Sequence, residues 1–308
     1  MGIHDRDYER RLSLAQERNS LITLIAINLV VFVILIFIRA ILSVQYGSLE
    51  VGTAKFQGSV VPWFSLPADL SKLATRPWTV LTHMFTHIDV WHIVGNMIWL
   101  WVFGFILHDL TGNKKIIPIY LYGGLAGALA YLLFYNLAPG MHDFLSGNVA
   151  LGASAGVMAV AVAVTTISPG YRIFTMLNGG FPIWILTVIY LLIDLASVGG
   201  YNSGGHVAHL AGALAGFLFV FFYQRGYDGG AWINRFFDWC HNLFNPEKPS
   251  RKADIKQELF YKATTKPYKR TPNITEQRID EILDKISQKG IEALTDEEKE
   301  LLKRASKE

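Results

Sequence analysis

Residues 21–42 read LITLIAINLVVFVILIFIRAIL, and Arg39 is the only charged residue in this stretch. About 20 consecutive apolar residues in a helix cross the hydrocarbon core of a bilayer, so the stretch predicts a membrane-spanning helix. A signal peptide has a shorter apolar core followed by a cleavage site of small residues. Neither description fits residues 21–42, and we therefore expect this helix to remain in the protein.

Further apolar stretches predict five more spans, at residues 92–110, 116–137, 150–168, 182–197 and 205–223. The 308-residue chain is 51% hydrophobic and 17% charged, and its last 84 residues hold 17 of the 28 Lys and Arg and 15 of the 25 Asp and Glu. A soluble domain carries about 25% charged residues throughout, so this asymmetry excludes one ordinary soluble domain. We expect an all-α membrane protein in which residues 21–223 form a six-helix bundle followed by a water-exposed helical tail.

Loop charges predict the orientation of the bundle, because Lys and Arg in short loops stay preferentially in the cytoplasm. Basic residues occur in the N-terminal segment 1–20, in the second and fourth loops and throughout the tail, whereas the third and fifth loops have none. Both termini are therefore expected to be cytoplasmic. The long first loop, residues 43–91, mixes Trp and Pro with polar residues and is expected to lie in the headgroup region.

A net charge of +3 is too small to indicate nucleic-acid binding, and the single Cys240 cannot close an intramolecular disulfide.

Polar side chains lie at one expected depth within these spans. His92 and Asn96 share a face of the second span at i, i+4 spacing, while Ser154 and His209 are expected about one turn into the fourth and sixth spans. All three helices start on the outer side, which puts Asn96, Ser154 and His209 roughly 6 Å below the outer ends of their helices, with His92 one turn above Asn96. A polar group inside a span is costly and therefore suggests a functional site.

Serine and histidine in contact predict nucleophilic catalysis, since His209 could take the proton of the Ser154 hydroxyl. Asn96, His92 and the backbone N–H of Ser154 could stabilise an oxyanion. Three glycines support close packing around these residues: Gly152, Gly212 and Gly216. Taken singly, the small-residue spacings are more typical of packing seams. A metal site of three histidines and Asp89 is an alternative, but the spacing of His83, His87 and His92 is not that of common zinc motifs, and we expect no metal and no cofactor.

At this point three motifs resemble those of the rhomboid intramembrane serine proteases. Residues 83–96, HMFTHIDVWHIVGN, resemble the family's HxxxHxxxxHxxxN segment. Residues 152–154, GAS, resemble its GxSG serine motif, and residues 208–216, AHLAGALAG, resemble its AHxxGxxxG segment. The resemblance covers about residues 78–223 and implies a six-helix bacterial-type protease core with an appended C-terminal module.

This resemblance implies that Ser154 is the nucleophile, His209 the base, and His92 and Asn96 the oxyanion donors. It further implies a Ser–His dyad that cleaves transmembrane proteins near their outer ends, in a bacterial inner membrane. A catalytically silent relative that binds or sorts membrane clients is the alternative, and a transporter is a more distant one. Asp194 in the fifth span could orient His209, but its expected place near the outer end of that helix argues against this.

The chain departs from the family pattern at four positions, namely Thr79 in place of an arginine, His108 in place of a glutamate, Ala155 in place of a glycine and Met158 in place of a tyrosine. Ala155 is expected to crowd the site or to shift its register. None of the four removes a catalytic atom. They put efficiency and loop packing in question more than activity.

The tail has three expected parts. Aromatic residues at helical spacing in 231–244 predict an interfacial helix. A basic linker is expected to follow it, at residues 245–272. Within 273–308, an apolar stripe closed by Gly290 and a capping box at residues 295–298 predict two short helices. So small a pair buries little apolar surface, and we expect it to dock on a partner or on a second copy of the chain.

Overall fold

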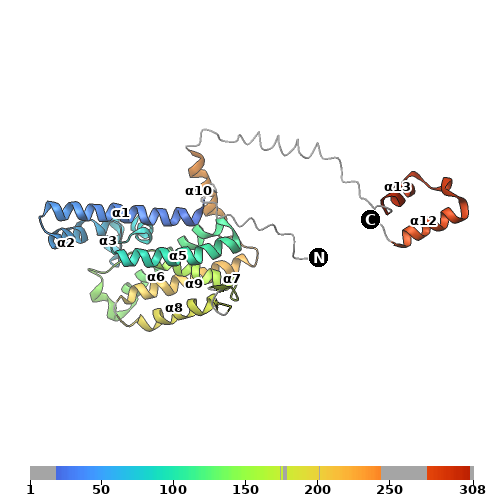
Figure 1. Ribbon diagram of the computed structural model, residues 1–308. Helices are drawn as coiled ribbons and strands as arrows, with labels where there is room; N and C mark the ends of the chain where they lie inside the picture. Colours follow the sequence, from blue (N-terminus) through green and yellow to red (C-terminus); the bar gives the residue numbers. More distant parts are fainter. Residues whose placement is uncertain (1–18, 174, 176–178, 201, 244–275, 306–308) are drawn as a thin grey trace. The chain divides into compact units, whose positions relative to one another are not determined.

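The computed structural model describes residues 19–243 and 276–305, apart from residues 174, 176–178 and 201. It divides into two compact units, Met1–Leu243 and Phe244–Glu308. The described part of the first unit is a helical bundle, as Figure 1 shows. Its apolar helices are α1 (Ser20–Gln45), α5 (Val90–Thr111), α6 (Ile116–Leu137), α7 (Ser154–Ile167), α8 (Ile183–Ser197) and α9 (Ser203–Tyr223). The prediction of an all-α membrane protein is confirmed.

Four of these helices, α1, α5, α6 and α9, are long and apolar enough to cross a membrane. The other two are shorter, with 14 residues in α7 and 15 in α8. The expected fourth span, 150–168, was therefore too long at its N-terminal end, where residues 149–150 form a strand and α7 begins only at Ser154. At 1.5 Å per residue α7 measures about 21 Å, less than the roughly 30 Å of a hydrocarbon core.

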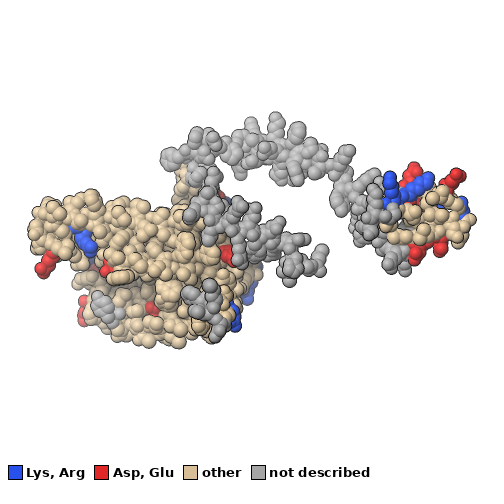
Figure 2. Space-filling model, in the orientation of Figure 1, with Lys and Arg blue, Asp and Glu red and all other residues tan. Residues whose placement is uncertain are grey.

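The outer surface of the first unit is apolar. Figure 2 shows few charged side chains over the helices of this unit. On α1, Val33 and Phe37 are 63% and 65% exposed. Such contiguous apolar exposure is stable in lipid but not in water.

Polar side chains fix where the helices begin. At the start of α1, Asn19 accepts hydrogen bonds from the N–H groups of Leu21 and Ile22, and Ser20 N–H donates to Asn113 Oδ1 at 2.6 Å. The second bond ties the start of α1 to η3 (Asn113–Lys115), the turn between α5 and α6. At the start of α5, Asp89 accepts from the N–H of His92 at 2.9 Å.

Helix α7 is the centre of the bundle. It packs against α5, α6 and α9, and residues Ala155 through Ala161 are all buried. The approach of α9 is unusually close, because a Cβ at Gly212 or Gly216 would collide with the carbonyl oxygen of Ala155 or Ala159. The expected role of these two glycines in close helix packing is therefore visible as direct backbone contact.

A short antiparallel ladder joins the first loop to the segment before α7. Strand β1 (Leu66–Pro67) pairs with β2 (Val149–Ala150), with Leu66 opposite Ala150, and Ala68 N–H donates to Asn148 O at 3.0 Å. A second ladder pairs β3 (Arg172–Ile173) with β4 (Phe181–Pro182) between α7 and α8.

The rest of the first loop is compact. It contains α2 (Leu49–Ser59), η1 (Val61–Trp63), α3 (Leu70–Thr75), α4 (Thr79–Thr82) and η2 (His83–Phe85). Trp63 and Trp78 stack with ring centroids 6.0 Å apart, and the Arg76 guanidinium lies 4.6 Å from the Trp63 ring. Thr79 takes no part in this stack, and the cation over the Trp63 ring is Arg76.

Helix α10 (Ala231–Leu243) occupies the expected interfacial segment and is fixed to the bundle at the end near η3. Trp232 Nε1 donates to Tyr122 Oη at 2.8 Å, and Asn234 Nδ2 donates to Lys114 O at 3.0 Å. Lys115 and Asp228 form an ion pair beside them. The N-terminal segment 1–18 and the expected basic linker, residues 245–272, lie outside the described residues.

The second unit contains α12 (Glu276–Lys289), η5 (Ile291–Ala293) and α13 (Asp296–Ala305). The hydrogen bonds of the expected capping box are present, since Thr295 N–H donates to Glu298 Oε2 at 2.8 Å and Glu298 N–H donates to Thr295 Oγ1 at 3.3 Å. Glu298 also pairs with Lys285 of α12, and these contacts lower the pKa of Glu298 to about 2. Gly290, with φ of +80°, closes α12 as expected.

Replacing Gly216 tests the seam between α7 and α9. Gly216→Ala should lower the free energy of unfolding by about 1–3 kcal/mol, because the methyl group must push the two backbones apart. The matched control is Gly95→Ala on α5, where a Cβ would meet no atom within 4 Å. Thermal unfolding in detergent checks this, and equal melting temperatures for the two variants would contradict the close-packing account.

Candidate active site

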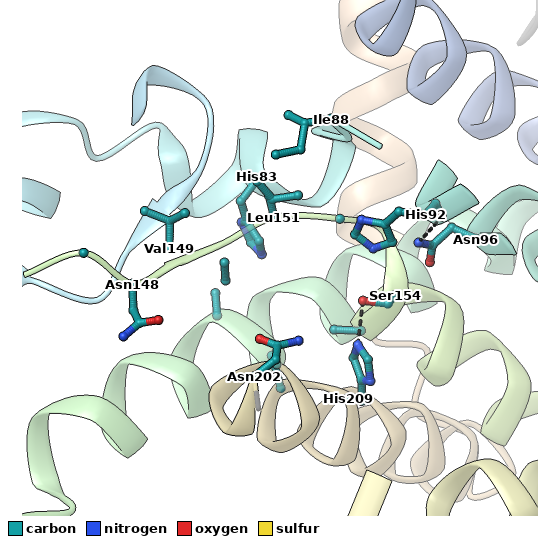
Figure 3. Close-up of a pocket in the computed structure, with 18 residues that line it drawn as sticks. His83, Ile88, His92, Asn96, Asn148, Val149, Leu151, Ser154, Asn202 and His209 are labelled. Carbon is teal, nitrogen blue, oxygen red and sulfur yellow. Dashed lines mark hydrogen bonds between the residues drawn. The ribbon is translucent and has the colours of Figure 1, made fainter. Parts of the chain in front are cut away.

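Three side chains from three helices form a continuous hydrogen-bonded chain. Ser154 Oγ lies 2.6 Å from His209 Nε2, and His209 Nδ1 lies 2.9 Å from Asp194 Oδ1 (Figure 3 shows the first contact). An ionised carboxylate only accepts hydrogen bonds, so Nδ1 of His209 carries the proton and donates it to Asp194. Nε2 is thereby left as the acceptor for the Ser154 hydroxyl. This is the protonation state that a general base for serine requires.

The helices deliver these residues at different points along their length. Ser154 is the first residue of α7, and His209 is the seventh residue of α9. The expectation that each lies about one turn into its helix was therefore wrong. Ser154 is the first residue of its helix because residues 149–150 form a strand and α7 begins only after them. His209 lies nearly two turns after the first residue of α9.

His92 and Asn96 lie on the same side of the site, as their spacing predicted. Both line the cavity that also contains Ser154 and His209 (Figure 3). Asn96 Nδ2 donates to His92 O at 2.9 Å within α5, which holds the amide at that place. The structure thus brings together all four residues that the sequence singled out.

Gly152 shapes the approach to the nucleophile. Its φ is +117°, a value that residues with a Cβ rarely adopt, and a Cβ here would come within 2.7 Å of the His92 ring. Gly152 N–H donates to His83 O at 2.8 Å, and Ala153 N–H donates to His87 Nε2 at 3.3 Å. Two residues of the HxxxH segment therefore hold the turn that presents Ser154.

His83 and His87 are structural by their surroundings. Both side chains are buried, and His83 Nδ1 lies 3.0 Å from Thr79 O. Burial lowers the pKa of His83 to about 4 and, together with the neighbouring His92, that of His87 to about 3. His83 Nδ1 and His87 Nε2 are each engaged with a backbone group, so a metal at the alternative site of His83, His87 and His92 would compete with these contacts.

Two cavities meet at Ser154. The first, of about 570 Å³, is polar in part and is lined by His92, Ser154 and His209 together with the β2 segment. The second, of about 290 Å³, lies among α5, α7, α8 and α9 and is mainly apolar, with Trp91, Trp99 and Tyr190 in its wall. Asn96, Ser154 and His209 line both cavities. A polypeptide segment that entered through the second cavity would therefore reach the polar groups exposed in the first cavity.

The departures at Ala155 and Met158 have structural explanations. Ala155 does not displace Ser154, since its methyl group faces Gly127 on α6 and its carbonyl faces Gly212 on α9. The expected crowding is thus relieved by two glycines on neighbouring helices. Met158 lines the second cavity beside Asp194 and His209, and the carboxylate rather than an aromatic ring holds the imidazole.

Two residues of the site were not selected from the sequence. Asp194 was set aside as an orienter, yet it is 5% exposed and in contact with His209. Its Oδ1 also lies 2.8 Å from Nδ1 of His206, which the sequence analysis did not consider. The i, i+3 spacing of His206 and His209 on one helix was a usable signal, because it places both rings on one face.

Comparison with known proteins adds the family context. Residues 74–226 match the family model described as Rhomboid domain, and residues 267–308 match a family of unknown function (DUF6576). The chain is similar to RHOMBOID-like protein 12, mitochondrial, of Arabidopsis thaliana, with 30% identity over 45% of this chain and 44% of the relative. It is also similar to the Presenilin-associated rhomboid-like protein, mitochondrial, of Homo sapiens, with 29% identity over 53% of this chain and 42% of the relative. The matches thus span less than half of each of these relatives.

Asp194 should matter for rate rather than for folding. In Asp194→Asn the amide can donate to His209 Nδ1, which places the imidazole proton on Nε2 and removes the acceptor for the Ser154 hydroxyl. We expect the rate constant of any reaction that uses Ser154 as the nucleophile to fall on the order of 10²-fold or more, with thermal stability within about 1 kcal/mol of the parent. A wild-type rate would show that the orientation of His209 does not depend on the carboxylate.

Burial of His87 predicts a pH dependence of stability. The pKa of about 3 is below the ordinary value of 6.5, so below pH 6.5 the unfolded chain binds more protons and acidification favours unfolding. His87→Gln keeps an acceptor for Ala153 N–H but does not titrate. Between pH 7.5 and 5.0 the parent should lose about 2 kcal/mol more than this variant, at 1.4 kcal/mol per pH unit. Parallel unfolding curves at the two pH values would contradict this.

Proposed function

The chain belongs to the rhomboid family, and from that premise we propose that it is an intramembrane serine endopeptidase that cleaves transmembrane proteins near their outer ends. The observation that carries the proposal is the chain of contacts from Ser154 through His209 to Asp194. A catalytically silent member would not need this arrangement. The intact contacts therefore favour the enzyme over the client-binding alternative.

In the proposed reaction Ser154 Oγ attacks the peptide carbonyl while His209 Nε2 takes its proton. The imidazolium that forms is stabilised by Asp194, which already accepts from Nδ1. His209 then protonates the leaving amine, and the acyl enzyme is hydrolysed by water. Water from the larger cavity, which opens beside Ser154, fits this second step.

Three hydrogen-bond donors would stabilise the negative charge on the tetrahedral intermediate, one from α7 and two from α5. The first N–H groups of a helix have no partner within it, so the N–H of Ser154 at the start of α7 is available as a donor, at the end of the helix where the dipole is positive. His92 and the Asn96 amide border the same cavity from α5. Each such donor is worth about 3–4 kcal/mol of barrier in serine hydrolases.

The mainly apolar cavity among α5, α7, α8 and α9 fits a substrate segment leaving the lipid. Trp91 and Ile193 in its wall are 80% and 55% exposed, so this side of the bundle offers apolar surface toward the bilayer. A helix cannot place a backbone carbonyl against Ser154 while its own hydrogen bonds are intact. Substrates with residues that loosen a helix at the cut are therefore proposed.

The proposed orientation puts the site near the outer face and both termini in the cytoplasm. The basic residues Lys114 and Lys115 lie at the end of the bundle that carries α10, away from the start of α7, which supports this. The compartment expected from the sequence was a bacterial inner membrane, whereas the relatives named above are mitochondrial. The proposed chemistry is the same in either membrane.

The test is cleavage of a single-span reporter protein by the purified chain in detergent. Ser154→Ala and His209→Ala should each abolish the product band, because each removes an atom of the proton transfer. Ser197→Ala, at the end of α8, is the matched control and should cleave like the parent. Product from Ser154→Ala would assign the nucleophile elsewhere. No product from a folded parent across several reporters would support the client-binding alternative.

A further inference from the structure

The Asp194 carboxylate serves two imidazoles rather than one. Oδ1 lies 2.8 Å from His206 Nδ1 and 2.9 Å from His209 Nδ1, and the two rings meet edge to face with centroids 5.9 Å apart. The mechanism proposed above uses only His209. A second histidine on the same oxygen calls for a different explanation.

These three groups have the composition and spacing of a metal site. Among the described residues, the potential ligand atoms of Asp194, His206 and His209 lie within 4.8 Å of one another. Two imidazole nitrogens and one carboxylate oxygen suit Zn²⁺ and related divalent transition metals, whereas Mg²⁺ and Ca²⁺ prefer oxygen ligands. Around a tetrahedral zinc with bonds of about 2.0–2.1 Å, neighbouring ligand atoms are about 3.3 Å apart. The pairs at 2.8 and 2.9 Å need to open by only about half an ångström.

The cluster is also accessible and held in place. Asp194 is buried, with 7% of its side chain exposed, while the side chains of His206 and His209 are 21% and 22% exposed. Both histidines are on α9, three residues apart, so one helix presents the two nitrogens to the carboxylate on α8. Asp194 and His209 border the cavity of about 290 Å³, which has room for a water as the fourth ligand.

We propose that Asp194, His206 and His209 form an inhibitory site for Zn²⁺ or a similar divalent transition metal. A metal on Nδ1 of His209 takes the lone pair that is freed when the Nδ1 proton moves to Nε2. The neutral ring keeps one proton and none is released, but Nε2 now donates to Ser154 and cannot accept its proton. The metal thus blocks the base without touching the nucleophile. The inhibition, but not the binding, rests on the proposed function.

Binding is measured without any proteolysis. The full-length Ser154→Ala protein, freed of metal with a chelator, is titrated with Co²⁺ and followed by its visible absorption, with Zn²⁺ as competitor. We expect one site, displacement of Co²⁺ by Zn²⁺, and no displacement by Mg²⁺. X-ray absorption at the zinc edge should show two imidazole ligands with the remainder oxygen.

The ligand assignment is tested with His206→Gln in the same background. This variant should bind Co²⁺ at least about 10-fold more weakly, since loss of a neighbour that only orients a ligand already costs 10–100-fold. His142→Gln, in η4 (Pro139–Phe144), is the matched control and should bind like the parent. Unchanged affinity in His206→Gln, thiolate in the absorption spectrum, or no binding at all would overturn the proposal. The X-ray absorption spectrum of the Ser154→Ala protein tests the ligand assignment even if His206→Gln fails to fold.

The inhibitory consequence is tested on the active protein. Saturating Zn²⁺ should lower reporter cleavage at least about 10-fold, a chelator should restore it, and His206→Gln, compared with its own metal-free rate, should need correspondingly more Zn²⁺. Binding at Asp194, His206 and His209 with cleavage unaffected would overturn the inhibitory role. Absence of any cleavage with binding intact would count against the proposed function instead, so the two failures are distinguishable.

Discussion

The contact of α9 with α7 through backbone atoms is the constraint on which the rest of the molecule depends. Because Gly212 and Gly216 have no Cβ, α9 can lie directly on the carbonyl groups of Ala155 and Ala159. His209 is one turn before Gly212, and Ser154 is next to Ala155. The hydrogen bond between Ser154 and His209 is therefore a result of helix packing, and a wider separation of the two helices would break it.

The Asp194 carboxylate has to be hydrogen-bonded because it is buried within the bundle. A buried charge is costly unless it is paired, and Asp194 is paired with two imidazoles. Those contacts fix the proton of His209 on Nδ1. The same carboxylate thus keeps the charge tolerable at this depth and sets the tautomer on which the chemistry depends.

Much of this could be predicted from the sequence, for reasons tied to particular residues. Runs of apolar residues located the helices, and i, i+4 spacing placed His92 and Asn96 on one face of α5. The start of α7 was not predictable in this way, because it depends on a ladder between residues 66–67 and 149–150, which are far apart in the chain. Asp194 was underestimated for a related reason: its position along α8 was known, but the rotation of α8 toward α9 depends on packing. His206 shows that a pair at i, i+3 in a span merits the same attention as the motif residue beside it.

The small length of α7 has a consequence for how the protein is made. A segment of 14 residues is too short to enter a bilayer stably by itself, whereas α6 and α9, with 22 and 21 residues, are long enough to do so. Because α7 has little surface left for lipid, its insertion is favourable mainly through contact with those neighbours. We therefore expect α7 to take its place late during biosynthesis, after its partners. Since Ser154 is the first residue of this helix, the chain would gain its nucleophile only when the bundle is essentially assembled.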